Sequence, residues 1–370
     1  MRAARPHPIR YAVVGLGHIA QVAVLPGFVH ARKNSRLTAL VSGDRRKLEA
    51  LSRRHRGVAT FTYEQYEECL AQVDAVYIAL PNSMHAEYTI RAANAGVHVL
   101  CEKPMAVTAG DCERMIEACE EAQVKLMIAY RLHFDDVTLS VLDLIRRRRI
   151  GEPKFFNSSF SLTVRRGDIR TQKALGGGTL YDIGIYCINA ARQVFDAEPK
   201  EVMAVSVNSG ARGLDEIDES TGALLRFDGE RVAAFVSSFN ADDVGSYRVL
   251  GTKGQLHVEP AYEYAEGLKY TMTMNGKTTR SRKTAKHDQF GAEIEYFSQC
   301  IQKGRAPEPS GYEGLQDVRI IEALYESAET GKAVAVPPFE KPSKAGVGQR
   351  ITKPGVKKPA LVRTQETSLS

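Results

Sequence analysis

The sequence has no apolar run long enough to span a membrane. A transmembrane helix needs about 20 consecutive apolar residues, and no stretch of the 370 residues approaches that length. Residues 1–10 are basic but lack the apolar core of a secretory signal. We therefore expect a cytoplasmic protein without membrane association.

Cysteine and histidine patterns typical of metal sites are also lacking. The six cysteines include no CxxC pair, and the nine histidines include no HExxH pair. The cysteines fall mostly within apolar patterns that predict buried helices and strands. We expect reduced core thiols and no metal.

Positive charge is in modest excess, with a formal net charge of +6. Much of it lies in the four arginines 146–149, which end an expected helix and offset its dipole, and in a lysine-rich C-terminal end. No nucleic-acid-reading module is recognisable, so we expect no nucleic-acid partner. The chain length predicts two domains.

The N-terminal region opens with a strand and a glycine-rich turn. Residues Tyr11–Val14 are apolar and run into Gly15-Leu16-Gly17-His18-Ile19-Ala20, a GxGxxA pattern followed by an expected helix. In dinucleotide-binding folds the first glycine permits the tight turn, and the second lets a pyrophosphate approach the backbone beside a helix N-terminus. We expect a dinucleotide to contact Gly15, Gly17, His18 and Ile19.

The end of the second expected strand, Leu37–Val41, bears on the choice of cofactor. An acid there holds the ribose of NAD, whereas chains that bind the extra phosphate of NADP avoid it. This chain continues Ser42-Gly43-Asp44-Arg45-Arg46-Lys47. If Ser42 takes the acid's place, a phosphate cradle forms from Ser42, Gly43, Arg45, Arg46 and Lys47. The alternative puts Asp44 on the ribose of NAD, although Asp44 is also a good N-cap for a helix over Arg45–Arg54. We favour NADP, with NAD second.

The strand expected over Asp74–Leu80 leads into a turn that should pass beneath the nicotinamide. Its sequence is Pro81-Asn82-Ser83-Met84-His85, and the candidate cofactor residues are Leu80, Pro81, Asn82 and His85. Turn chemistry explains the proline and asparagine equally well, and the histidine could cap a helix or pack.

The short apolar strand Val97–Cys101 ends at Glu102-Lys103-Pro104. Ligands bind just beyond the carboxyl ends of strands in open parallel sheets, so Lys103 should point into the binding crevice. The alternative is a solvated loop lysine. By the same argument, a strand over Lys125–Tyr130 places Arg131 at the crevice.

From Gly151 onward apolar and polar residues alternate with period two, which predicts an antiparallel sheet with one covered face. A helix is expected after the glycines 176–178. On it, Asp182, Tyr186 and Asn189 share one face, because they are four and three residues apart. Such a polar stripe needs partners or substrate; alternatively, the tyrosine hydroxyl emerges from the core beside a surface acid.

Together these motifs resemble the Gfo/Idh/MocA oxidoreductases. The resemblance spans residues 9 to about 336 and rests on Gly15-Leu16-Gly17, Glu102-Lys103-Pro104, the glycines 176–178 followed by Asp182-Ile183-Gly184-Ile185-Tyr186, and Glu313-Gly314-Leu315-Gln316-Asp317. Tyr186 stands where inositol dehydrogenases carry histidine. The chain is therefore most similar to the branch of glucose–fructose oxidoreductase and of xylose and dihydrodiol dehydrogenases.

The resemblance implies an α/β protein in which a Rossmann domain is joined to an α/β domain with a large, open-faced, mainly antiparallel sheet. It implies homo-oligomers, dimers or tetramers, formed through that sheet. It also implies that Lys103 and Tyr186 flank the nicotinamide with Asp182 as the accompanying acid, and it supports NADP. We expect domains at residues 9–130 and 131–340 and a flexible basic tail at residues 341–370.

These residues permit hydride transfer between a nicotinamide and a hydroxyl of an aldose or related polyol. Tyr186 would act as the acid or base, and the Lys103 ammonium would favour its phenolate form. Asp182 and Arg131 would help to orient the substrate. Two alternatives remain: a dehydrogenase of trans-dihydrodiols or other cyclic diols, and a non-catalytic regulator that senses NADP and sugar.

Overall fold

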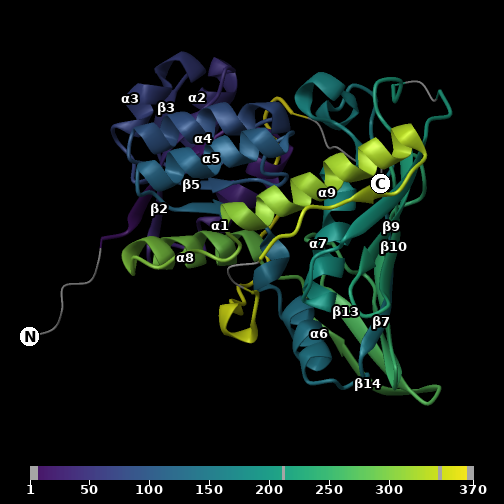
Figure 1. Ribbon diagram of the computed structural model, residues 1–370. Helices are drawn as coiled ribbons and strands as arrows, with labels where there is room; N and C mark the ends of the chain where they lie inside the picture. Colours follow the sequence, from purple (N-terminus) through teal and green to yellow (C-terminus); the bar gives the residue numbers. More distant parts are fainter. Residues whose placement is uncertain (1–6, 211–212, 341–343, 365–370) are drawn as a thin grey trace, which may run out of the picture.

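The computed structural model describes residues 7–210, 213–340 and 344–364, which form two sheets flanked by helices (Figure 1). The first sheet has six parallel strands in the order β3-β2-β1-β4-β5-β6. This is the strand order of a Rossmann domain, as expected. The strands are β1 Ile9–Val14, β2 Ser35–Val41, β3 Ala59–Phe61, β4 Ala75–Ile78, β5 His98–Cys101 and β6 Leu126–Ile128.

Helices cover both faces of this sheet. Helices α4 (His85–Asn94) and α5 (Ala109–Glu121) lie on one face. The helical turns of residues 18–27, which end in α1 (Leu25–Gly27), lie on the other with α8 (Gln289–Gln302). The expected helix α2 (Arg45–Arg54) and the short α3 (Tyr66–Leu70) complete the domain.

Helix α8 reaches the first sheet from far along the chain. Its buried Phe290, Ile294 and Phe297 belong to the same core as Tyr11 and Tyr77 of the first sheet. Local sequence does not reveal this position, because periodicity shows which face of a helix is buried but not what it packs against.

The second sheet has nine strands in the order β14-β13-β12-β11-β7-β10-β9-β8-β15. Among the described strands of this second sheet, only β7 and β10 pair in parallel, so the sheet is mainly antiparallel, as expected. The strands are β7 Pro153–Ser161, β8 Glu201–Val207, β9 Ser220–Phe227, β10 Arg231–Ser238, β11 Val244–Gly251, β12 Gly254–Val258, β13 Lys269–Met274, β14 Lys277–Lys283 and β15 Val334–Ala335.

One face of the second sheet is covered and the other is open. Helices α6 (Asp136–Arg146), α7 (Ile185–Phe195) and α9 (Gly311–Thr330) lie on the covered face (Figure 1). The open face carries exposed apolar side chains along three strands: Met203, Val205, Val207, Leu224 and Val236. The open-faced architecture implied by the resemblance is therefore confirmed.

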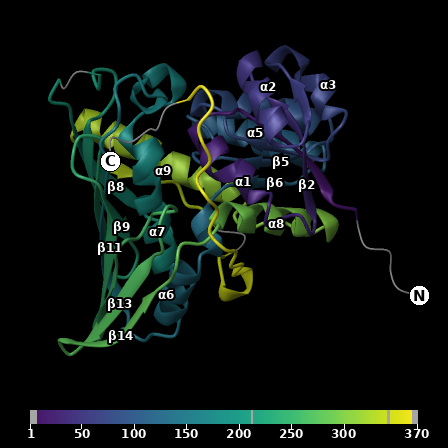
Figure 2. The ribbon, with the colours of Figure 1, turned by 180° about the vertical axis from the view of Figure 1, so that it is seen from behind.

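The described part of the tail runs through the junction of the two halves (Figure 2). It pairs with the preceding chain at a bridge between His287 and Pro354. The flexibility expected for the tail and the expected domain limits stay predictions. All six cysteines are buried free thiols, as expected. Among the described residues, no helix has the length and apolar character needed to cross a bilayer.

Candidate active site

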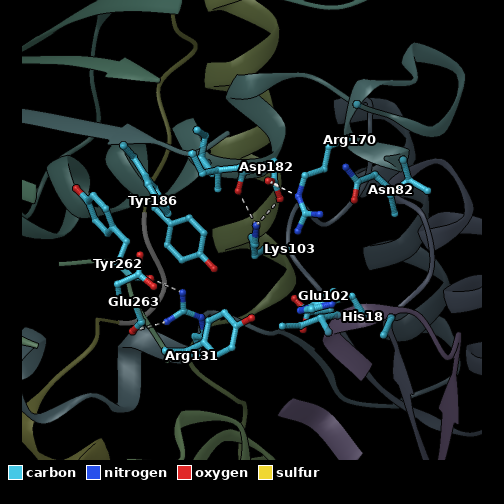
Figure 3. A pocket seen from close by; sticks show the side chains of 18 of the residues that line it. His18, Asn82, Glu102, Lys103, Arg131, Arg170, Asp182, Tyr186, Tyr262 and Glu263 are labelled. Atoms are coloured by element: carbon cyan, nitrogen blue, oxygen red, sulfur yellow. Dashed lines mark hydrogen bonds and ion pairs between the residues drawn. The ribbon is translucent and has the colours of Figure 1, made fainter. Parts of the chain in front are cut away.

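A cavity of about 360 Å³ lies between the carboxyl edge of the first sheet and the covered face of the second (Figure 3). Both halves of the chain contribute to its lining. The predicted site residues that it brings together are His18, Ile19, Leu80, Asn82, Glu102, Lys103, Arg131, Asp182 and Tyr186.

Lys103 projects into the cavity from the loop after β5. Its Nζ donates a hydrogen bond to the backbone oxygen of Asp182 (2.6 Å) and lies 3.5 Å from the Asp182 carboxylate. Burial alone would raise the pKa of Asp182, but the charges of Arg170 and Lys103 outweigh burial and lower it. The acid therefore stays ionised and holds the ammonium in place.

Tyr186, on the first turn of α7, lies between two cations. Lys103 Nζ is 4.6 Å and Arg131 Cζ is 5.0 Å from the centre of its ring. The ring also packs against Phe160 and Tyr262, at centroid distances of 5.6 and 5.8 Å. Figure 3 shows its hydroxyl directed into the cavity. The predicted juxtaposition of Lys103, Asp182 and Tyr186 is thus present.

Arg131 follows β6 and is buried beside the cavity. Its guanidinium donates hydrogen bonds to the backbone oxygens of Tyr262 and Glu263 and to the side chain of Gln289. Burial lowers the pKa of Arg131, but nearby Tyr186 and Glu263 raise it more, so the net shift is upward. Arg131 is a fixed cation at the crevice, where it was expected.

Arg170 also lines the cavity, and the sequence analysis missed it. Its Nε donates to the Asp182 carboxylate (2.6 Å), and a terminal nitrogen lies 3.2 Å from Asp168. The nearby glycines were a partial signal. A side chain at Gly177 would come within 2.3 Å of the Arg170 backbone oxygen, so the turn needs glycine for close backbone approach. That pattern does not reveal which segment approaches.

Asn82 joins the two halves at the rim of the cavity. Its side-chain amide donates to the backbone oxygen of Gly176 (2.8 Å). A Cβ added to Gly176 would lie 2.8 Å from the Asn82 side chain, so the glycine permits this contact. The expected cofactor residue therefore also fixes the glycine turn in place.

The glycine-rich turn after β1 has the shape that a dinucleotide needs. Gly15 has a φ of +89°, and an added Cβ would lie 2.5 Å from the Ala79 backbone oxygen. At Gly17, by contrast, no described atom lies within 4 Å of an added Cβ. The backbone is thus tight against the sheet at Gly15 and open at Gly17, where a pyrophosphate would approach.

In the turn after β2, Asp44 makes the contact expected of a helix cap. Its carboxylate accepts a hydrogen bond from the backbone N–H of Lys47 (3.0 Å) and so caps α2. Its own N–H donates to Ser42 Oγ (3.3 Å), which places Ser42 inside the turn. The exposed Arg45 and Arg46 lie on the first turn of α2. Together with Gly43, these residues have the composition of the expected phosphate cradle.

His85 differs from its predicted role. The ring is fully buried, and its two nitrogens lie 2.9 Å from the backbone oxygens of Pro104 and Leu80. Burial lowers the pKa of His85. The side chain thus braces the turns after β4 and β5 and is not part of the described cavity lining, nor is Pro81. The packing alternative describes His85 better than cofactor contact.

Glu102 lines the cavity beneath Lys103 and has an unexpected partner. Tyr77 Oη lies 2.8 Å from Glu102 and 2.7 Å from Glu293 of α8. Burial raises the pKa of both carboxyl groups. This buried pair holds the end of β5 against α8.

Asn189 is turned away from the cavity. Its amide donates to Glu313 (2.9 Å) and Asp317 (3.0 Å) of α9. The same two acids bind the buried guanidinium of Arg192. The polar stripe expected on this helix therefore divides: Asp182 and Tyr186 serve the cavity, whereas Asn189 joins a buried ionic network.

Comparisons with known proteins agree with this architecture. Residues 9–130 match the GFO/IDH/MocA oxidoreductase family, NAD-binding Rossmann fold, and residues 138–257 match the GFO/IDH/MocA C-terminal domain. The chain is 34% identical to D-xylose 1-dehydrogenase [NADP(+)] of Haloarcula marismortui, over 90% of this chain and 94% of that protein. It is 26% identical to trans-1,2-dihydrobenzene-1,2-diol dehydrogenase of Xenopus tropicalis, over 86% and 95%.

A solved structure is similar over most of the chain. The aldose-aldose oxidoreductase from Caulobacter crescentus, complexed with glycerol, aligns with a TM-score of 0.84 and 36% identity. The alignment covers 89% of this chain and all of that one. The fold, the glycine-rich turn and these matches show that the chain belongs to the Gfo/Idh/MocA oxidoreductase family.

Proposed function

We propose that this protein is an NADP-dependent oxidoreductase that moves a hydride between the nicotinamide and a hydroxyl of an aldose or related polyol. The observation that carries the proposal is the cluster of Lys103, Asp182 and Tyr186 in one cavity beside the glycine-rich turn. The xylose dehydrogenase and aldose oxidoreductase relatives support a sugar as substrate.

The cavity residues divide the chemistry among them. Bound NADP supplies the hydride acceptor or donor. In its phenolate form Tyr186 would take the proton from the substrate hydroxyl, and as the phenol it would return that proton in the reverse direction. Lys103 and Arg131 lie against the face of its ring, a favourable position for a cation, and so hold the ring in place. Asp182 keeps Lys103 in position and so fixes the reacting geometry.

Two features favour NADP over NAD. Ser42 is buried in the turn after β2, and Asp44 is engaged as a helix cap. The exposed Arg45 and Arg46 lie on the first turn of α2, directly after this turn, and could pair with a 2′-phosphate. The xylose dehydrogenase relative is named for NADP(+) as well.

The test is spectrophotometric. The unmodified protein is offered NADP⁺ or NAD⁺ with a panel of aldoses, inositols and cyclic diols, and absorbance is followed at the reduced-nicotinamide band. We expect reduction of NADP⁺ with an aldose. Tyr186→Phe should lower turnover by at least about a hundredfold, the size of a typical acid–base contribution, with little change in NADP⁺ affinity. Unchanged turnover would remove Tyr186 from the proposed role.

A cyclic diol is the second candidate substrate. The aromatic side chains of Phe160, Tyr262 and Tyr264 line the cavity and suit a flat ring, and one relative is a dihydrodiol dehydrogenase. Activity in the same panel with trans-dihydrodiols alone would favour it. No turnover in the panel, with NADP⁺ bound in calorimetry, would favour the sensing regulator.

A further inference from the structure

The C-terminal strap, residues 353–363, lies along the first domain, although that domain is formed mainly by the N-terminal part of the chain. At the start of the strap, Lys353 Nζ pairs with Glu295 of α8 (2.6 Å). The backbone oxygen of Lys353 accepts a hydrogen bond from the N–H of Asp288 (3.0 Å). Further on, Arg54 of α2 donates to the backbone oxygen of Ala360 (2.7 Å). The strap thus passes from α8 to α2 through the junction in Figure 2.

The strap is anchored at the glycine-rich turn. The backbone N–H of Val362 donates to the side-chain oxygen of Gln21 (2.7 Å), and the Gln21 amide donates back to the Val362 oxygen (3.0 Å). The same amide donates to the backbone oxygen of Leu16, within the glycine motif (2.9 Å). Gln21 is buried, so a fixed side chain ties the strap to the turn that receives the pyrophosphate.

This anchor places Arg363 at the proposed phosphate cradle. Its Nε donates to the Asp44 carboxylate (2.7 Å). Asp44 is the acid that would repel a 2′-phosphate beside Ser42, and Arg363 neutralises it. A guanidinium has five N–H donors and can bind an anion with two of them at once. One of the five serves Asp44, which leaves capacity for a phosphate.

Lys358 is a second cation of the strap, five positions before Arg363. It lines the active-site cavity and also a second cavity of about 80 Å³ that shares His18 with the first. The five Cα–Cα steps from Lys358 to Arg363 can span at most about 17 Å, so both cations lie within reach of one dinucleotide. The strap carries four cations, Lys353, Lys357, Lys358 and Arg363, and no acid.

We propose that the C-terminal strap forms the outer wall of the cofactor groove, with Arg363 binding the 2′-phosphate of NADP and Lys358 lying beside the pyrophosphate. Arg363 is thereby a residue that selects NADP over NAD. The inference rests on the proposed NADP cofactor and is independent of the sugar.

Binding calorimetry with the full chain tests the role of Arg363. The probes are NADP⁺, NAD⁺, adenosine 2′,5′-bisphosphate and 5′-AMP, which separate the 2′-phosphate from the rest of the cofactor. Arg363→Ala should weaken NADP⁺ and the bisphosphate by about tenfold or more, as expected for a lost charge-assisted phosphate contact. Its affinity for NAD⁺ and 5′-AMP should stay within about twofold of the unmodified protein.

Lys344→Ala is the matched control, because Lys344 is another tail cation paired with an acid, Asp196, at 2.6 Å. It should leave all four affinities unchanged. An unchanged or tighter NADP⁺ affinity in Arg363→Ala, or an equal loss for NADP⁺ and NAD⁺, contradicts the inference. A preference of the unmodified protein for NAD⁺ contradicts the proposed cofactor itself.

Limited trypsin digestion of the unmodified protein is a second test of the proposal and needs no variant. Trypsin cleaves after Lys357 and Arg363, whereas Pro359 blocks cleavage after Lys358. Saturating NADP⁺ should slow cleavage at both sites more than saturating NAD⁺ does, as followed by mass spectrometry. Equal rates with the two cofactors contradict a direct contact between strap and 2′-phosphate.

Discussion

Asp182 is held from two directions, by Arg170 and by Lys103, and this shared acid sets the position of the ammonium beside Tyr186. The side chain of Arg170 is partly buried, and although burial lowers its pKa, Asp182 and Asp168 raise it more. The result is a chain of alternating charges that ends beside the Tyr186 ring.

Replacing Asp182 by asparagine keeps the shape but removes the charge. We expect kcat/KM with the best sugar to fall by about tenfold to a hundredfold, because Lys103 loses the carboxylate that positions it. The affinity for NADP⁺, measured by calorimetry, should change little.

Asp168→Asn is the control for the Asp182 variant, because Asp168 contacts Arg170 but has no recorded contact with Lys103. Its effect on kcat/KM should be several times smaller. An equal loss of kcat/KM in the two variants would show that activity depends on all the ion pairs around Arg170, and not specifically on the contact between Asp182 and Lys103.

At the residue scale, the predictable part of the site was the part encoded by local patterns. Lys103 follows a buried strand, and Tyr186 and Asp182 share one helix face. Arg170 lies in a single 3-10 turn, Ile169–Thr171, which is too short to show a periodic pattern, so no local pattern indicated that its side chain lines the cavity. For His85 both cofactor contact and packing were open, because the sequence of a turn does not show whether a histidine ring faces a ligand or backbone carbonyls.

At the scale of elements, the open face of the second sheet is its most distinctive surface. Met203 pairs with Leu224 across β8 and β9, and both side chains are exposed, as are the neighbouring Val205 and Val236. Apolar patches of this kind on a protein surface mark interaction sites. We propose that a second copy of the chain covers this face, in line with the homo-oligomer that the resemblance implies.

Val205→Asp tests this proposal. Val205 is 66% exposed, so an aspartate there should leave the fold intact but bury a charge in the interface. We expect sedimentation velocity to show a shift toward the monomer. Thr278→Asp adds the same charge on β14, at the other end of the sheet, and should leave the oligomer unchanged. If the unmodified protein sediments as a monomer, the proposal is wrong.

The period-two alternation expected from Gly151 onward is present in β8, β10 and β12 but not in β14. The seven residues of β14, Lys277–Lys283, include no apolar side chain, so the strand exists only because β13 offers it hydrogen-bond partners. Pairing between strands is a tertiary property, and no local pattern encodes it.

At the scale of the whole molecule, His287 stands where α8, the start of α6 and the strap meet. Its Nε2 lies 2.8 Å from Asp135, the N-cap of α6, and its backbone pairs with Pro354. Burial lowers the pKa of His287, but the hydrogen bond to Asp135 raises it more, so the net shift is above the usual 6.5.

A histidine with a raised pKa stabilises the fold through its protonated form. The contribution is fully present below about pH 6.5 and is lost as the pH rises through the folded-state pKa. His287→Gln should therefore lower the melting temperature more at pH 6 than at pH 9, as measured by calorimetry. His257→Gln is the control, because burial and Arg248 lower the pKa of His257 despite its pairing with Glu259, so its loss should show no such trend.

The arrangement of the two halves could be predicted only in outline. The resemblance supplied both architectures, but the return of α8 and the strap to the first domain joins segments that are more than 200 residues apart. Such contacts depend on how the whole chain closes, which no window of sequence shows.

The position of α8 has a consequence for biosynthesis. A ribosome releases the first 130 residues long before Gln289–Gln302, the helix that covers one apolar face of their sheet. At typical translation rates the gap lasts about ten to thirty seconds. During that time the nascent domain exposes Tyr11 and Tyr77, the kind of surface that chaperones recognise. The first domain is therefore synthesised first, but its core is completed only when α8 has been synthesised.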